Sequence, residues 1–243
     1  MITKRRKLAR LGAALVVAAL VAAAGLFALS RSRRYQVFGE LVSRVETDDR
    51  VVALTLDDGP TPEGTDAILR VLEAKGVRAT FFLTGAEIER CPELARKIAA
   101  AGHEIGNHSY AHERMVMMSQ ARIAEEVERT DALIRETGYD GPILFRPPYG
   151  KKLFGLPYYL EKTGRTSVMC DVEPDSFDEA AASPDWIVAH VLERARPGSI
   201  VLLHVMYPSR RSSLDAVAGV VDALRADGYR FVTASELLAL GGR

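Results

Sequence analysis

The stretch that decides the fold is Val51-Val52-Ala53-Leu54-Thr55-Leu56-Asp57-Asp58-Gly59-Pro60. Its first six residues are uncharged and rich in apolar and β-branched side chains, which predicts a buried strand. Two aspartates leave that strand at a Gly-Pro turn, although an ordinary Asx-type turn is the alternative for such a pair. In α/β barrels the chemistry gathers at the C-terminal ends of the strands. We therefore expect a parallel barrel strand that ends at two functional carboxylates, Asp57 and Asp58.

The alternation of strand and helix continues along the chain. Strand-like runs are expected at residues 51–56, 79–83, 103–106, 143–145, 166–172, 200–203 and 230–232. Amphipathic, helix-like segments lie between them at residues 65–75, 93–101, 119–137, 184–195 and 214–226. Strands that alternate with helices imply an α/β protein with a parallel sheet. The prediction is a distorted (β/α) barrel of about seven strands, with an open doubly wound sheet as the alternative.

Two histidines follow the third of these strands. His108 and His112 are four residues apart, a spacing that brings both imidazoles to one side of a helical turn and that is common among metal ligands. Ser109 stands where the HExxH motif of zinc proteases has glutamate, which excludes that class. A surface or helix-capping pair is the alternative. With the aspartates, the pair indicates a metal site in which one carboxylate binds the ion and the other acts as a base.

Two more strand ends carry polar groups. Arg146 follows an apolar run, and Pro147-Pro148 stiffens the chain behind it because proline fixes φ and restricts the preceding residue. A guanidinium held in this way can clamp a carboxylate bidentately. The backbone N–H of Tyr149 is a candidate oxyanion donor. His204 ends another strand, where a core histidine bonded to a carbonyl is the alternative to a catalytic group.

Together these strings resemble the polysaccharide deacetylase family, the NodB-like carbohydrate esterases of family four. The family's Thr-Phe-Asp-Asp-Gly-Pro is similar to residues 55–60, and its His-Ser/Thr-x-x-His to residues 108–112. Its Arg-x-Pro-Tyr loop is similar to residues 146–149, and its Leu-x-His to residues 202–204. The resemblance covers about residues 50–236, and the ordered set is highly specific although each string alone is not.

One string departs from the family pattern. Relatives end a strand with Asp-Trp, whereas this chain has Asp171-Val172-Glu173-Pro174-Asp175-Ser176-Phe177, with Ser176 at the acidic position and Phe177 at the tryptophan. Phe177 remains a candidate aromatic wall for a sugar ring. We expect Asp175 to orient His204, because the bend at Pro174 can swing it into place; a serine hydroxyl or a water is the alternative.

The resemblance implies a metal-dependent hydrolase that removes N-linked acetyl groups from the amino sugars of a polysaccharide or oligosaccharide and releases acetate. Asp58, His108 and His112 would hold a divalent ion, with Zn²⁺ as the expected one. Asp57 would be the general base and His204 the general acid. The other expected site residues are Arg146 and Asp175, which would orient these two groups, and the substrate contacts Pro148, Tyr149 and Phe177.

Two other functions stay open. An O-acetyl esterase of the xylan type would use the same site, because an ester is cleaved more easily than an amide. A catalytically inactive glycan-binding module held at the membrane is the other. The presence of the three expected ligands together with Asp57 and His204 disfavours that inactive module.

The charge distribution bears on partners. The chain has 32 basic and 32 acidic residues, but residues 1–34 hold eight basic residues and no acid, so residues 35–243 carry a net charge of −8. A negative domain is a poor partner for nucleic acid and suits a neutral or cationic glycan. The two cysteines, Cys91 and Cys170, are expected to be free apolar thiols. The oligomeric state is not predicted.

A membrane segment precedes the domain. Leu11–Leu29 contains 19 residues without a charge and, as a helix, would span roughly 28 Å, close to the hydrocarbon thickness of a bilayer. Five basic residues precede it and three follow, so the positive-inside rule places the N-terminus in the cytoplasm and the domain outside. A cleaved signal peptide is the rival, and a buried soluble helix a weaker one. We expect a basic N-terminus with a single-pass anchor or signal at 1–34, a linker at 35–48 and a catalytic domain at 49–240.

Overall fold

The strand predicted from the opening stretch lies at the centre of the sheet. The computed structural model describes residues 2–241, with side chains from residue 10 onward. β2 (Val51–Asp57) pairs in parallel with β3 (Thr80–Leu83) and β6 (Ser199–His204), and its first residues also pair with β7 (Arg230–Val232). β4 (Glu104–Asn107) continues the sheet beyond β3, which gives the order β4-β3-β2-β6.

Single bridges close this sheet into a ring. Phe145 pairs with Asn107 on one side and with Ser167 of β5 (Ser167–Val168) on the other, and Val172 pairs with Val201 of β6. The predicted distorted barrel is therefore confirmed over the open sheet. The run at 143–145 contributes only one bridging residue, and the run at 166–172 is regular over two residues. Pro147, which cannot donate to a ladder, follows the first run two residues after Phe145.

The segment expected as a linker is folded against the domain. Within residues 35–48, β1 (Leu41–Val42) pairs in parallel with β5, and Val45 donates its backbone N–H to the carbonyl of Gly198 at 2.9 Å. Gln36 and Val45 are buried. The backbone of this segment pairs with the outer edge of β5, which would otherwise present unpaired backbone groups. Residues 41–45 are thus part of the folded unit and do not form a free linker.

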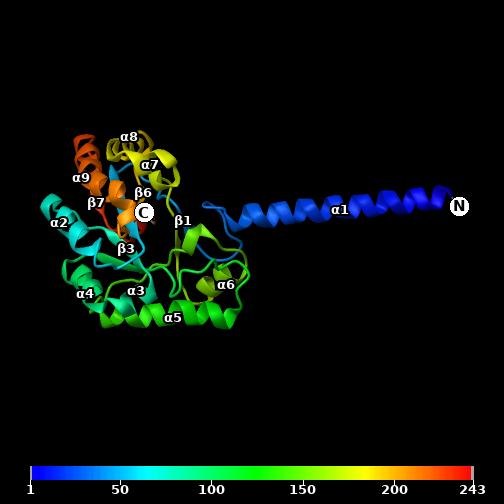
Figure 1. Cartoon of the computed structure of the whole chain (residues 1–243), viewed down its shortest axis with the longest axis horizontal. Coiled ribbons are helices and arrows are strands. Elements are labelled where there is room, and N and C mark those ends of the chain that lie inside the picture. Colours follow the sequence, from blue (N-terminus) through cyan, green and yellow to red (C-terminus); the bar gives the residue numbers. More distant parts are fainter. Residues whose placement is uncertain (1, 242–243) are drawn as a thin grey trace.

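Helices surround the strands (Figure 1). The five amphipathic segments form α2 (Thr65–Lys75), α4 (Pro92–Ala100), α5 (Gln120–Glu136), α8 (Pro184–Arg194) and α9 (Arg211–Ala226). The sequence did not predict α3 (Gly85–Arg90), α6 (Gly155–Lys162), α7 (Asp178–Ala182) and α10 (Ala234–Leu238). Each of these four is at most eight residues long, too short to display a helical period.

The alternation of β2 decides which side chains reach the site. Val52, Leu54 and Leu56 pack under the outer helices, whereas Val51 and Ala53 belong to the interior of the barrel. Because side chains alternate along a strand, Thr55 and Asp57 continue the interior set. The interior is apolar at its N-terminal end and becomes polar where β2 ends. Cys91 and Cys170 are buried free thiols, as the sequence predicted.

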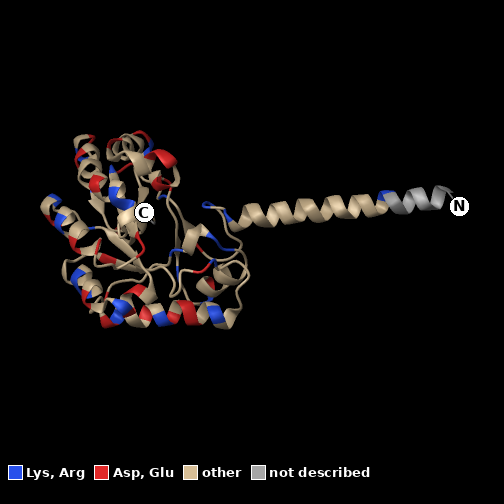
Figure 2. Cartoon of the chain, in the orientation of Figure 1, with Lys and Arg blue, Asp and Glu red and all other residues tan. Residues whose placement is uncertain are grey.

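α1 (Ile2–Ser30) projects away from the barrel (Figure 1). Its segment Arg10–Ser30 is long and apolar enough to cross a bilayer, and its large apolar side chains are exposed, Leu20 by 65%. No Lys, Arg, Asp or Glu interrupts the helix between Arg10 and the domain (Figure 2). A helix with this much uncovered apolar surface is not the core helix of a soluble domain, which excludes that alternative.

Candidate active site

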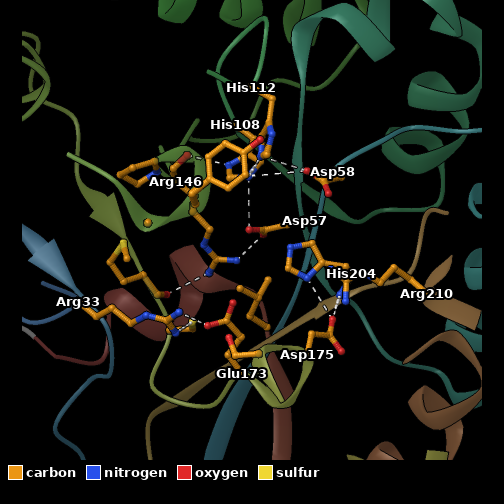
Figure 3. A pocket seen from close by; sticks show the side chains of 17 residues that line it. Arg33, Asp57, Asp58, His108, His112, Arg146, Glu173, Asp175, His204 and Arg210 are labelled. Carbon is orange, nitrogen blue, oxygen red and sulfur yellow. Dashed lines mark hydrogen bonds and ion pairs between the residues drawn. The ribbon is translucent and has the colours of Figure 1, made fainter. Parts of the chain in front are cut away.

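Asp57 lies at the mouth of the barrel, held by Arg146 (Figure 3). Asp57 Oδ1 accepts from Arg146 Nη1 at 2.6 Å, and both side chains are buried. The other guanidinium bonds go to Thr55 Oγ1 and to the carbonyls of Val168 and Met169. The expected bidentate clamp is thus a single bond, because the remaining N–H groups satisfy buried oxygens. Burial opposes ionisation, but Arg146, His108 and His204 together lower the pKa of Asp57, which keeps it a carboxylate.

Asp58 reaches the same cleft through an unusual backbone conformation. Its φ is +72°, in the left-handed region that Asp tolerates better than most residues. On a regular strand Asp57 and Asp58 would face opposite sides. The left-handed turn redirects Asp58, so that its Oδ1 lies 3.4 Å from His112 Nε2 and 3.9 Å from His108 Nε2.

The two histidines meet through a loop, which corrects the predicted helical turn. Ser109 and His112 have φ values of +65° and +55°, and residues 108–112 are not helical. Asn107 Oδ1 accepts from the N–H of Ser109 at 2.8 Å, and Ser109 Oγ accepts from the N–H of His112 at 3.1 Å. These local bonds offer the backbone an alternative to the helix. They bring the two Nε2 atoms to 3.2 Å.

The donor set of Asp58, His108 and His112 fits a divalent metal ion. One ligand atom from each side chain lies within 4.8 Å of the other two. His108 Nδ1 lies 2.8 Å from the carbonyl of Arg146, the partner that fixes a ligating imidazole and leaves Nε2 free. Burial, followed by the neighbouring His108, lowers the pKa of His112 to about 4, so it is neutral and able to ligate. A carboxylate and two imidazoles are typical of catalytic zinc sites.

His204 faces the carboxylates from the neighbouring strand. It is the register partner of Asp57 across β6 and β2. Its Nδ1 lies 3.1 Å from Asp175 Oδ2, which also accepts the backbone N–H of His204 at 2.5 Å. Ser213 Oγ donates to the second oxygen of Asp175 at 2.6 Å. Burial lowers the pKa of His204, but the bond to Asp175 and the nearby carboxylates outweigh it and raise that pKa.

The sequence left two alternatives for the group that orients His204, and in the structure that group is Asp175. It starts the short 3-10 helix Pro174–Ser176 together with Pro174, and this turn swings its side chain under the imidazole (Figure 3). Ser176 lines the cavity without an assigned bond to His204. Asp171 instead binds Ser199 Oγ and the N–H of Ile200.

A cavity of about 360 Å³ joins these groups. Tyr149 lines it and lies against His112, with ring centroids 4.6 Å apart. Pro148 is buried behind the wall, and Pro147 lines the cavity in its place. Phe177 is outside the lining: its ring packs on Trp186 and His190, with centroids 5.7 and 4.9 Å away, because the chain turns there into α7.

The cavity is also lined by residues to which the sequence assigned no role in the site, among them Arg33, Cys170, Glu173 and Arg210. Arg33 forms an ion pair with Glu173 (Figure 3). The signal for Arg33 was its place among the arginines after the apolar span. The contact with Glu173 could not be predicted from the sequence, because the two residues are more than a hundred positions apart.

The comparisons with known proteins agree with this site. The family model described as "Polysaccharide deacetylase" matches residues 44–168. A peptidoglycan-N-acetylglucosamine deacetylase of Bacillus cereus is 34% identical over 200 residues, which are 82% of this chain and 93% of the relative. A chitooligosaccharide deacetylase of Bradyrhizobium sp. is 35% identical over 74% of this chain and 87% of its own.

Solved structures share the fold. The crystal structure of a peptidoglycan N-acetylglucosamine deacetylase superposes with a TM-score of 0.76 at 31% identity, covering 80% of this chain and 91% of the other. Similarity of this extent in sequence and in structure, over the part of the chain that carries the site, leads to one conclusion. The chain belongs to the polysaccharide deacetylase family, the NodB-like carbohydrate esterases of family four.

Proposed function

We propose that the protein is a metal-dependent N-deacetylase of an N-acetylated glycan outside the cytoplasm. The observation that supports it is the convergence of Asp57, the three candidate ligands and His204 on one cavity. An acetamide needs activated water, a stabilised oxyanion and a protonated leaving nitrogen. A divalent ion held by Asp58, His108 and His112 would supply Lewis-acid polarisation and a more acidic water.

The chain's own residues supply the proton transfers. Asp57 accepts a proton from the attacking water, since Arg146 occupies only Oδ1 and leaves Oδ2 facing His108. His204 donates a proton from Nε2 to the leaving amine, because its Nδ1 is bonded to Asp175. Base and acid therefore reach the scissile bond from adjacent strands, as general acid–base catalysis requires. The backbone N–H of Tyr149 as an oxyanion donor stays a prediction.

The test of this function is acetate release by purified full-length protein, supplemented with Zn²⁺, on a panel of acetylated glycans. Chitooligosaccharide and peptidoglycan fragments should release acetate and expose free amines. Acetylated xylan is the comparison, since preferential release from it would identify an O-acetyl esterase instead. Absence of release from every glycan would leave the inactive binding module.

Asp175→Asn should shift the alkaline limb of the pH–rate profile to lower pH. Asp175 raises the pKa of His204, so its removal lowers the pH at which the acid form of His204 is lost. The measurement is kcat against pH on a soluble chitooligosaccharide. Asp178→Asn, a nearby change of an exposed carboxylate, is the matched control. An unmoved alkaline limb in Asp175→Asn would show that Asp175 does not support His204.

The domain should lie outside the cytoplasmic membrane, attached through α1. Protease added to spheroplasts should then degrade residues beyond Arg34 while a cytosolic marker stays intact. The fractionation of the intact chain distinguishes the two forms of export: an anchored protein stays with the membrane, whereas a cleaved one is released. Protection of the domain until lysis would contradict the orientation inferred from the flanking charges.

A further inference from the structure

The arginines that follow the apolar span have no part in the proposed reaction. Arg31, Arg33 and Arg34 are exposed, and on the outer side of a membrane basic residues are disfavoured by the positive-inside rule. Their presence at this position calls for a ligand or a structural role. The surroundings of the junction between α1 and the barrel distinguish these possibilities.

The junction is fixed to the domain. α1 ends at Ser30, which is buried, and the backbone N–H of Lys152 donates to its carbonyl at 3.1 Å. Lys152 Nζ donates to the carbonyl of Ser32, and Lys152 is 1% exposed. Because no flexible linker intervenes, the height of the cleft above the membrane is set by the structure.

That height is small. Arg33 is four residues beyond Leu29, where the apolar span ends, and four residues reach at most roughly 14 Å. The headgroup layer is about 5–8 Å thick on each side of the hydrocarbon core. Arg33 lines the catalytic cavity and pairs with Glu173. One wall of the cavity therefore lies beside the headgroups when α1 spans a bilayer.

A cluster of cations surrounds this point; we call Arg31, Arg33, Arg114 and Lys151 the junction cluster. Arg31 and Lys151 lie over the same ring, Phe27, at 5.2 and 5.7 Å from its centroid. Arg114 lies over the ring of Tyr149 at 4.8 Å. Burial and then the charges of Arg31, Arg114 and Arg33 lower the pKa of Lys151. Figure 2 shows basic segments where α1 enters the domain.

The junction cluster is short of negative charge. Among the side chains that the structure describes, only Arg33 of the four has a carboxylate within ion-pair distance. The remainder of the domain is acidic overall, so the cluster is a local exception. Like charges held together are unfavourable unless an anion joins them, and guanidinium groups match phosphate oxygens in geometry.

We propose that the junction cluster binds the phosphate or pyrophosphate that links a glycan to a membrane lipid. The substrate is then an N-acetylated glycan still carried on its lipid, with the lipid in the bilayer beside α1, the phosphate at the cluster and the acetamide in the cavity. This inference rests on the proposed deacetylase function and on a retained α1. A free neutral polymer would leave the junction cluster without a partner.

The experiment uses the full-length protein in phosphatidylcholine nanodiscs with Zn²⁺. The two substrates are tetra-N-acetylchitotetraose in solution and the same glycan joined to a polyprenyl pyrophosphate in the disc. The variant is R31Q/R114Q/K151Q, and the matched control is R70Q/R96Q/R194Q, three exposed arginines on α2, α4 and α8. Wild type should prefer the lipid-linked glycan in kcat/KM. The junction variant should lose that preference, by about fivefold for each charge and so roughly 100-fold, whereas the control should keep it.

The arms separate the ways in which the proposal can fail. Equal losses on both glycans would mean that the cluster supports the cleft and does not bind phosphate. A second outcome is that the junction variant loses activity relative to wild type only in discs that contain phosphatidylglycerol. That result would assign the cluster to lipid headgroups and overturn the proposal. Wild type that is active on the soluble glycan without preferring the lipid-linked one refutes this inference alone. Inactivity on both of these glycans and on every glycan of the panel described above would refute the proposed function and this inference with it.

Discussion

Asp57→Asn should lower kcat by about 10²–10⁴, the range for removal of a general base, while the protein keeps its metal. An asparagine preserves the size of the side chain, and its amide oxygen can still accept from Arg146 Nη1, which lies 2.6 Å from Asp57 Oδ1. What is lost is the basicity of the oxygen that faces His108. The measurements are acetate release, metal content after dialysis, and the melting temperature.

A control for charge and folding is available in Asp66→Asn. Asp66 pairs with Lys97 at 2.8 Å on the surface, and such a pair contributes little to stability, so this variant should retain full activity. The outcome that would contradict the assignment is a loss of metal from Asp57→Asn, with activity restored by excess Zn²⁺. Asp57 would then be a ligand, and the base would be another group.

His112→Ala should abolish stoichiometric metal binding and lower kcat by about 10³ or more, since polarisation by the metal contributes several kcal/mol to the barrier. His112 is one of three candidate ligands, and its side chain is 28% exposed. It follows that its truncation leaves no large cavity in the core and the fold should persist. Metal content by mass spectrometry gives a readout that is independent of activity.

His190→Ala is the matched control for this histidine substitution. Its ring stacks on Trp186 with centroids 4.7 Å apart, outside the cavity, so metal content and rate should stay at wild-type values. Chelation of wild type followed by Zn²⁺ addition should remove and restore activity, whereas His112→Ala should not recover. Full metal occupancy in His112→Ala would refute the three-residue site.

Local pattern in the sequence was sufficient for the regular elements. The uncharged run before Asp57 predicted β2, and the apolar stripe of residues 119–137 predicted α5, because burial imposes a period of two or of 3.6 on the residues that form one face. The same reasoning missed the short helices and overestimated the strand at 143–145. There only one residue, Phe145, takes part in bridges, and Pro147 follows two residues later.

The sequence by itself determined the family, the apolar N-terminal helix and the residue types of the site. The tertiary structure decided which atoms meet: the left-handed turn at Asp58, the loop that joins the Nε2 atoms of His108 and His112, and Asp175 in place of Ser176 beneath His204. The contact between Arg33 and Glu173 arises in the same way. The physical reason is that periodicity and propensity act between near neighbours. Side chains far apart in sequence meet only when the barrel closes and its register brings them to one rim.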